Sequence, residues 1–227
     1  MGTTNLSVHA LRGRWKPKKE ALLAIQDSHP TCIRLHRAFS WIARCENETD
    51  LDTSLICLWI AFNSLYAQWD EDRREPQRDI QSLRTFIDRI IGLDESNHLS
   101  SMLQEQHDKV MNIFDDEYLS AYFWVEPSRV RASKSKKSKF DARTWYIDGK
   151  WRLLTERLVE RIYLLRCQII HGAATHGGKL NRDSLKKCAQ MLRDLLNCFL
   201  LVITDHGHQQ DWGMMCNPPL NSPQSMT

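Results

Sequence analysis

The chain has 227 residues, of which 42% are hydrophobic, and a formal net charge of +3. This length allows one large domain with its own core, and the near-balance of charge does not by itself require a polyanionic partner. The seven cysteines are odd in number and mostly stand within apolar helical patterns. We therefore expect reduced thiols in a cytoplasmic protein. No signal-peptide pattern follows the basic N-terminus and no apolar run is long enough to span a bilayer, so no membrane partner is expected.

The first half of the chain predicts four amphipathic helices that follow an N-terminal arm. Residues 1–27 are basic and weakly patterned, which predicts an irregular arm or a short helix. Apolar side chains at steps of three and four then predict helices over about 30–46, from 51 to about 69, from Pro76 to Gly92, and over 96–114. The run from residue 51 is the clearest, and it should be central to the core. Asn63 lies at the edge of its apolar stripe, where an amide needs either a structural hydrogen bond, the commoner case, or a function.

A basic segment follows the short aromatic stretch 117–124, for which helix is favoured. Between residues 129 and 143 one acidic residue stands among seven basic ones, interleaved with serines. This composition predicts a mobile loop over about 126–148, which either holds an RNA backbone or is simply a solvated linker. The seven basic residues are Arg129, Arg131, Lys134, Lys136, Lys137, Lys139 and Arg143.

The second half predicts two long helices and a tail. An apolar stripe runs from Trp151 to Ile169, and Gly172 breaks the pattern. Asn181 can cap a last helix that reaches about Val202, and residues 206–227 form a C-terminal tail. Because no alternating strand pattern, phosphate-binding loop or internal repeat is present, the sequence predicts an all-α fold with a single helical domain over about 28–205.

The end of the helix at Gly172 carries the two residues best suited to catalysis, Arg166 and His171. At about 100° per residue, Arg166 falls roughly 75° to the side of the apolar stripe and His171 nearly opposite to it, facing solvent or a partner. A guanidinium can hold a phosphate bidentately, and an imidazole can transfer protons near neutral pH, so the pair suits metal-free phosphodiester cleavage by a ribose 2′-hydroxyl. The commoner explanation is an ion-paired arginine and a surface histidine at a helix end.

Metal binding is a weaker alternative. One set of ligands is Cys167, His171 and His176, and another is His206, His208 and Cys216. Neither set has the paired Cys-x-x-Cys spacing of a zinc site, so we expect neither a metal nor a cofactor.

Four segments together resemble one protein superfamily. The Arg166-x4-His171-Gly172 pattern near the end of a long helix of an all-α chain resembles the HEPN superfamily. Three further stretches, Trp59–Tyr66, Asn181-Arg182 and 211–219, together with 165–175, resemble its Apea-like branch in bacteria. The similarity extends over most of residues 30–219.

The resemblance implies a helical bundle that forms a homodimer, with the Arg-His motifs of both subunits lining one cleft. Catalytic relatives are metal-independent endoribonucleases, often in defence or toxin–antitoxin systems, which makes RNA and a cognate antitoxin expected partners. Inactive relatives serve instead as nucleotide-binding or assembly modules. The alternatives to a ribonuclease are therefore an inactive module that binds nucleotide, RNA or a protein partner, and a purely structural helical dimer. By position, Arg166 would hold the scissile phosphate and His171 would be the acid and base. The residue after the motif arginine is usually polar in this family, but here it is Cys167. The expected auxiliary residues are Asn63, Cys167, Gln168 and Thr175.

Overall fold

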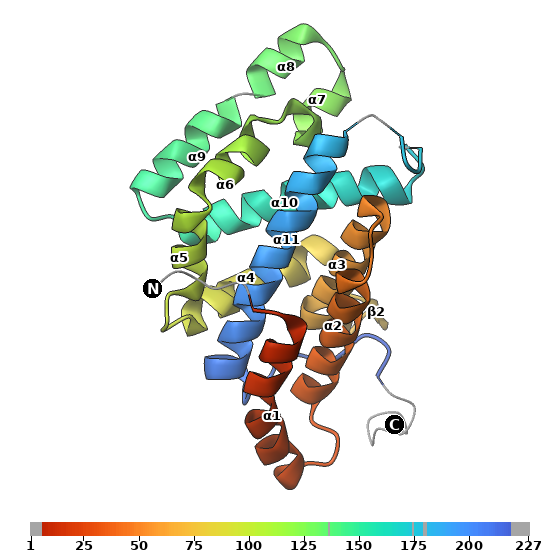
Figure 1. The fold of residues 1–227 in the computed structure, drawn as a ribbon, viewed down its shortest axis with the longest axis vertical. Coiled ribbons are helices and arrows are strands. Elements are labelled where there is room, and N and C mark those ends of the chain that lie inside the picture. Colours follow the sequence, from red (N-terminus) through yellow and green to blue (C-terminus); the bar gives the residue numbers. More distant parts are fainter. Residues whose placement is uncertain (1–5, 136, 174, 179–180, 219–227) are drawn as a thin grey trace.

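The protein is an all-α domain built around two long helices that cross each other, as the computed structural model shows (Figure 1). The structure describes residues 6–135, 137–173, 175–178 and 181–218. The long helices are α10 (Trp151–Ile170) and α11 (Arg182–Val202), followed by a π-helical turn, η2 (Ile203–Gly207). The helices before them are α1 (Val8–Ile25), α2 (Pro30–Glu46), α3 (Leu51–Tyr66), α4 (Asp79–Leu93), α5 (His98–Glu105), α6 (His107–Asp115), the 3₁₀ turn η1 (Glu117–Leu119), α7 (Ala121–Val125), α8 (Arg129–Ser135) and α9 (Lys137–Ile147).

Helix α3 lies at the centre of the core, as its apolar pattern predicts. Asp50 caps its N-terminus by accepting a hydrogen bond from the Thr53 amide at 2.7 Å. Phe62 is fully buried, and its ring lies 4.7 Å from that of Tyr66, 5.9 Å from Phe86 on α4 and 5.6 Å from Phe199 on α11, measured between centroids. These aromatic contacts join three helices and fix the position of the α3 surface that faces α10.

The predicted helices of the first half are confirmed with three corrections to their limits. Helix α2 has the predicted bounds, but α3 ends at Tyr66 and the next helix begins at Asp79. Pro76 instead belongs to a small antiparallel hairpin between β1 (Trp69–Asp70) and β2 (Glu75–Pro76). The single helix predicted over 96–114 is divided at Gln106 into α5 and α6.

The prediction of an irregular N-terminal arm or short helix was wrong, because α1 is an 18-residue helix packed on α2. Leu11, Trp15 and Leu22 lie on one face of α1 and are buried. Pro17 stands inside the helix among exposed basic residues, and together these residues obscure the apolar face in the sequence.

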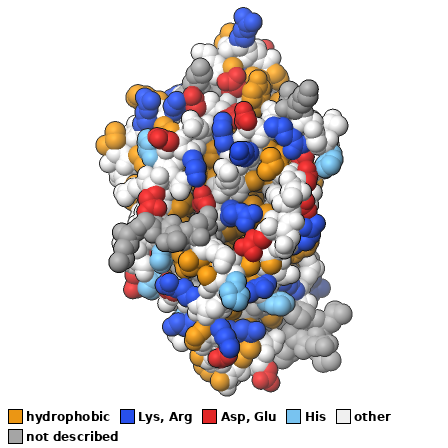
Figure 2. Space-filling model, in the orientation of Figure 1, with side chains coloured by type: hydrophobic (Ala, Val, Ile, Leu, Met, Phe, Trp, Pro, Cys, Tyr) orange, Lys and Arg blue, Asp and Glu red, His pale blue; other side chains and the backbone are white. Residues whose placement is uncertain are grey.

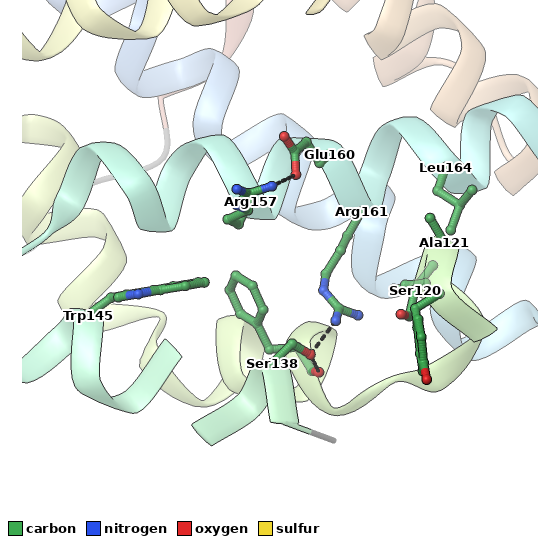
Figure 3. A pocket seen from close by; sticks show the side chains of 11 residues that line it. Ser120, Ala121, Ser138, Trp145, Arg157, Glu160, Arg161 and Leu164 are labelled. Atoms are coloured by element: carbon green, nitrogen blue, oxygen red, sulfur yellow. Dashed lines mark hydrogen bonds and ion pairs between the residues drawn. The ribbon is translucent and has the colours of Figure 1, made fainter. Parts of the chain in front are cut away.

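The prediction of a basic loop over about 126–148 was also wrong, because most of its described residues form the helices α8 and α9. These two helices lie at the end of the molecule opposite α1 (Figure 1). Arg161 on α10 anchors this segment. Its side chain is 8% exposed and donates hydrogen bonds to the carbonyls of Ile113 and Asp116, at 3.1 and 2.9 Å, and to Ser138 on α9. Figure 3 shows this guanidinium reaching from α10 toward Ser138. Burial lowers the Arg161 pKa to about 10, which leaves the side chain charged at neutral pH.

The C-terminal tail packs against the domain over its described part. Arg34 on α2 is 2% exposed, and it donates to the carbonyls of Ser64, Leu65 and Ala67 at the end of α3 and to those of Trp212 and Gly213 in the tail, at 2.9–3.5 Å. The Trp212 side chain is buried against Phe86, with ring centroids 5.6 Å apart. One guanidinium therefore joins the end of α3 to the tail, which the sequence did not predict. Residues 219–227 of the predicted tail lie outside the described residues.

Candidate functional site

The Arg166–His171 motif occupies the C-terminal end of α10, as predicted. Arg166 is half-buried in the last turns of the helix, and His171 is its exposed C-cap residue. Gly172 follows with φ of +71°, a left-handed conformation that ends the helix and that favours glycine. Five residues of helix separate the two side chains by about 140° of rotation and about 7.5 Å of rise. One copy of the helix therefore presents them on different faces.

Arg166 lies among aromatic and thiol groups. Its guanidinium carbon is 5.8 Å from the centroid of the Tyr163 ring, and its Nη1 is 3.9 Å from the Sγ atom of Cys167. A hydrogen bond between Cys167 and the Tyr163 hydroxyl, together with burial, raises the Tyr163 pKa, so the phenol stays protonated at neutral pH. Within the described part of the chain, no carboxylate lies within 4 Å of the Arg166 guanidinium. The motif cation is thus available for an external anion.

The wall of α3 that faces α10 carries three buried polar atoms without hydrogen-bond partners among the described residues. They are Nε1 of Trp59, Oδ1 of Asn63 and the hydroxyl of Tyr66, spaced so that all three lie on one face of the helix. The Trp59 ring lies 5.6 Å from the Tyr163 ring of α10. Burial raises the Tyr66 pKa, and the nearby charges of Asp79 and Arg166 act on it with opposite sign. The expected role of Asn63 stays a prediction, but no structural hydrogen bond accounts for its oxygen.

The sequence reasoning missed Trp59, Tyr66 and Tyr163 as neighbours of the motif. A signal was present in the spacing, because Tyr163 precedes Arg166 by three residues and Trp59 precedes Asn63 by four. Side chains at these spacings share a helix face.

Gln168 faces the other side of α10 and joins two segments. Its Nε2 donates to the carbonyl of Tyr118 at 3.2 Å, and its Oε1 accepts from Nδ2 of Asn181 at 3.3 Å. Asn181 occupies the predicted N-cap position of α11, but its backbone is left-handed and its side chain makes no capping bond, because it is turned to Gln168 instead. Gln168 thus organises the end of the motif helix structurally.

The turn after His171 is tied to the start of α3. Asp52 accepts hydrogen bonds from Arg182, at 2.5 Å, and from the Gly177 amide, at 3.2 Å, and Arg182 also donates to the Gly178 carbonyl. Thr175 is exposed in this turn, and its carbonyl accepts from the Gly178 amide at 2.9 Å. No described contact joins Thr175 to Arg166. The ion pair of Asp52 with Arg182 therefore joins the start of α11 and the adjoining glycines to the start of α3.

Neither of the two predicted sets of metal ligands forms a compact group in the described part of the chain. The group that does come together is Asp50, Asp52 and His176, with one ligand atom from each within 4.8 Å of the others. Asp50 is already the N-cap of α3, and Asp52 is already paired with Arg182. These carboxylates therefore have structural partners.

The basic residues of the predicted RNA-binding segment lie on α8 and α9. Lys139 pairs with Asp115 at 2.8 Å, Arg131 pairs with Glu126 at 3.3 Å, and the Arg131 guanidinium lies 4.2 Å from the Tyr122 ring centroid. Arg129, Lys137 and Arg143 belong to the same two helices, whereas Lys136 and the side chain of Lys134 lie outside the described residues. On the face shown in Figure 2, basic and acidic side chains are interspersed rather than gathered into one stripe.

Comparison with protein-family models, with curated proteins and with solved structures finds no match for this chain. The structure therefore establishes the fold class, which is an all-α domain. No described helix combines the length and the apolar character needed to cross a membrane.

Proposed function

We propose that this protein is a metal-independent endoribonuclease of the HEPN type, which cleaves RNA by attack of the 2′-hydroxyl in a cleft between two copies of the chain. The observation that carries the proposal is the state of Arg166. It is a half-buried guanidinium held against Tyr163 and Cys167, with no carboxylate partner within the described residues. Without a carboxylate partner, the guanidinium keeps its full charge and its donors for an external phosphate.

The placement of His171 supports a site shared between two copies. Its imidazole is exposed at the end of α10 and is turned about 140° from Arg166. A two-fold axis near this helix end brings the Arg166 of one copy toward the His171 of the other. The proposed partners are therefore RNA and a second copy of the chain.

Each group then has a chemical role. Arg166 binds the scissile phosphate through two N–H groups and stabilises the negative charge that builds on its oxygens. His171 of one copy accepts the proton of the 2′-hydroxyl, whose oxygen attacks phosphorus, and the imidazolium of the other copy protonates the departing 5′-oxygen. The products are a 2′,3′-cyclic phosphate and a 5′-hydroxyl. The proposal includes a defence or toxin role in the cytoplasm with a cognate antitoxin.

The alternative is a catalytically inactive module of the same type that binds nucleotide, RNA or a protein. Cys167 favours this alternative, because it replaces the usual polar residue and its thiol is engaged with Tyr163 and Arg166. A thiol is a weak donor and a weak acceptor, so it cannot replace an amide beside the phosphate.

The deciding experiment incubates the purified protein with total RNA in EDTA. Wild type should cleave RNA, whereas His171→Ala and Arg166→Ala should each abolish cleavage and remain folded dimers. Matched controls are His176→Ala, whose imidazole is 79% exposed in the following turn, and Arg152→Ala on the same helix, whose guanidinium pairs with Asp88. Both controls should keep activity. Equal cleavage by wild type and both motif variants would refute the proposal, and RNA binding without cleavage would favour the inactive module.

A further inference from the structure

A surface cavity of about 480 Å³ adjoins the end of α10. It lies between the turn η1 and the start of α11, and its lining includes Glu117, Tyr118, Asn181, Asp183 and Lys187. A volume of this size is in the range of small-molecule sites and can hold one nucleotide. No residue of the Arg166–His171 motif lines the cavity, so its ligand is a separate question from the cleavage chemistry.

Tyr118 presents an aromatic surface at this cavity. Its side chain is 42% exposed, although the ring is held edge to face by Phe123, with centroids 5.4 Å apart. Its carbonyl accepts hydrogen bonds from Nε1 of Trp124 at 2.8 Å and from Gln168 at 3.2 Å. The ring is therefore both exposed and fixed in position. Exposed aromatic rings of this kind stack on the bases of single-stranded nucleic acids.

Gln168 connects the cavity to the motif. It is bonded to Tyr118 on one wall and to Asn181 on the other. His171 follows Gln168 by three residues, and side chains at this spacing share one face of a helix. The cavity and His171 therefore lie on the same side of α10.

The charged groups around the cavity select for the kind of base. Asp116 is already engaged, because it accepts hydrogen bonds from Ser184 and from the Tyr118 amide. Arg182 also lines the cavity, but its guanidinium is paired with Asp52. Within the described part of the chain, Glu117, Asp183 and Lys187 take part in no ion pair. Two unpaired carboxylates repel a phosphate but accept hydrogen bonds from a base.

Guanine matches this arrangement better than the other bases. Its N1–H and N2–H₂ groups are adjacent donors for one carboxylate, and its O6 and N7 accept from an ammonium group such as that of Lys187. Adenine and cytosine place a ring-nitrogen acceptor where guanine has the N1–H donor, and uracil has only one donor on this edge.

We propose that the cavity is a guanine-binding subsite for the nucleotide next to the scissile phosphate, in which Tyr118 stacks on the base and Glu117 or Asp183 accepts from its donor edge. This inference rests on the proposed ribonuclease function for the identity of the ligand. It makes the substrate single-stranded RNA that contains guanosine.

The test measures binding of the four nucleoside 3′-monophosphates to the full-length His171→Ala protein by calorimetry, so that no cleavage is needed. Guanosine 3′-monophosphate should bind at least about fivefold more tightly than the other three. The double variant Glu117→Gln, Asp183→Asn should lose this preference. Tyr118→Leu should weaken binding of all four by at least about fivefold, whereas Tyr122→Leu, which removes an equally exposed ring outside the cavity, should not.

Equal affinity for the four nucleotides, or unchanged binding in folded Tyr118→Leu, would overturn the subsite. Loss of the dimer in Tyr118→Leu with nucleotide binding intact would also overturn it, because the surface would then be a protein contact. The two proposals fail separately. Cleavage of RNA without base preference leaves the ribonuclease and removes the subsite, whereas a guanine preference without cleavage by wild type keeps the subsite and removes the ribonuclease.

Discussion

Replacing Tyr66 with phenylalanine removes a buried hydroxyl that has no hydrogen-bond partner among the described residues. The ring itself is 1% exposed and packs against Phe62, and phenylalanine keeps that packing. Tyr146 provides the control, because its side chain is partly buried and its hydroxyl donates to the carbonyl of Leu103 at 2.8 Å. The same chemical change therefore removes an unsatisfied group at one position and a satisfied group at the other.

The two variants should change stability in opposite directions. A buried polar group without a partner costs about 1–3 kcal/mol, so Tyr66→Phe should leave the free energy of unfolding unchanged or raise it by about 1 kcal/mol. Tyr146→Phe leaves the Leu103 carbonyl without this donor and should lower it by about 1 kcal/mol. For a chain of this size, each 1 kcal/mol corresponds to about 2–4 °C in Tm.

Thermal and urea unfolding of the two variants measure this difference, and cleavage of RNA in EDTA is measured beside it. If the Tyr66 hydroxyl serves the site around Arg166, Tyr66→Phe should reduce cleavage while the protein is at least as stable as wild type. Tyr146→Phe should show the reverse pattern. The reasoning is refuted if Tyr66→Phe destabilises the protein as much as Tyr146→Phe does, since its hydroxyl would then have a structural partner.

Three further predictions concern the motif residues, the basic helices α8 and α9, and His29 at the start of α2. Mixing wild type with an excess of His171→Ala under conditions of subunit exchange should suppress the activity of the wild-type chains, because each mixed dimer keeps only one of the two histidines that act on the substrate, and unchanged activity would mean that the groups act within one chain. Replacing Lys137, Lys139 and Arg143 with glutamine should weaken single-stranded RNA binding and reduce the slope of log affinity against log salt by about 2, and an unchanged slope would exclude these helices from the RNA path. Nδ1 of His29 accepts from the Thr31 amide at the start of α2, and burial lowers the His29 pKa below 6.5, so the proton binds preferentially to the unfolded chain. The free energy of unfolding should therefore fall as the pH drops from above 6.5 through the folded-state pKa. Urea titrations at several pH values should show a smaller fall in His29→Asn than in wild type. The fall that remains in this variant is due to His208, whose pKa is also lowered by burial.

The sequence predicted those helices whose own apolar side chains repeat at helical spacing. The apolar stripes of α2, α3, α10 and α11 indicated the core, and the exposure of His171 and the half-burial of Arg166 followed from their angles to one stripe. These predictions succeeded because burial on a long helix is set locally by a repeat of 3.6 residues.

The errors lie where distant residues decide the structure. The basic segment reads as a loop on its own, yet α9 forms because Arg161 binds Ser138, Ala142 is buried, and Trp145 packs on Phe114 with ring centroids 5.8 Å apart. None of these contacts is visible in local composition. The unpartnered atoms on α3 could not be predicted either, because their lack of partners depends on how α3 packs against the other helices.

Arg34 also joins parts of the chain that are synthesised at different times. During synthesis its helix and the three carbonyls at the end of α3 emerge early, but the carbonyls of Trp212 and Gly213 follow Arg34 by 178 and 179 residues. Until then the buried guanidinium keeps only part of its hydrogen bonds, and the indole that covers Phe86 is missing. A chain cut before Trp212 should therefore lack these contacts and be more open to proteolysis at the α3 end than the full chain.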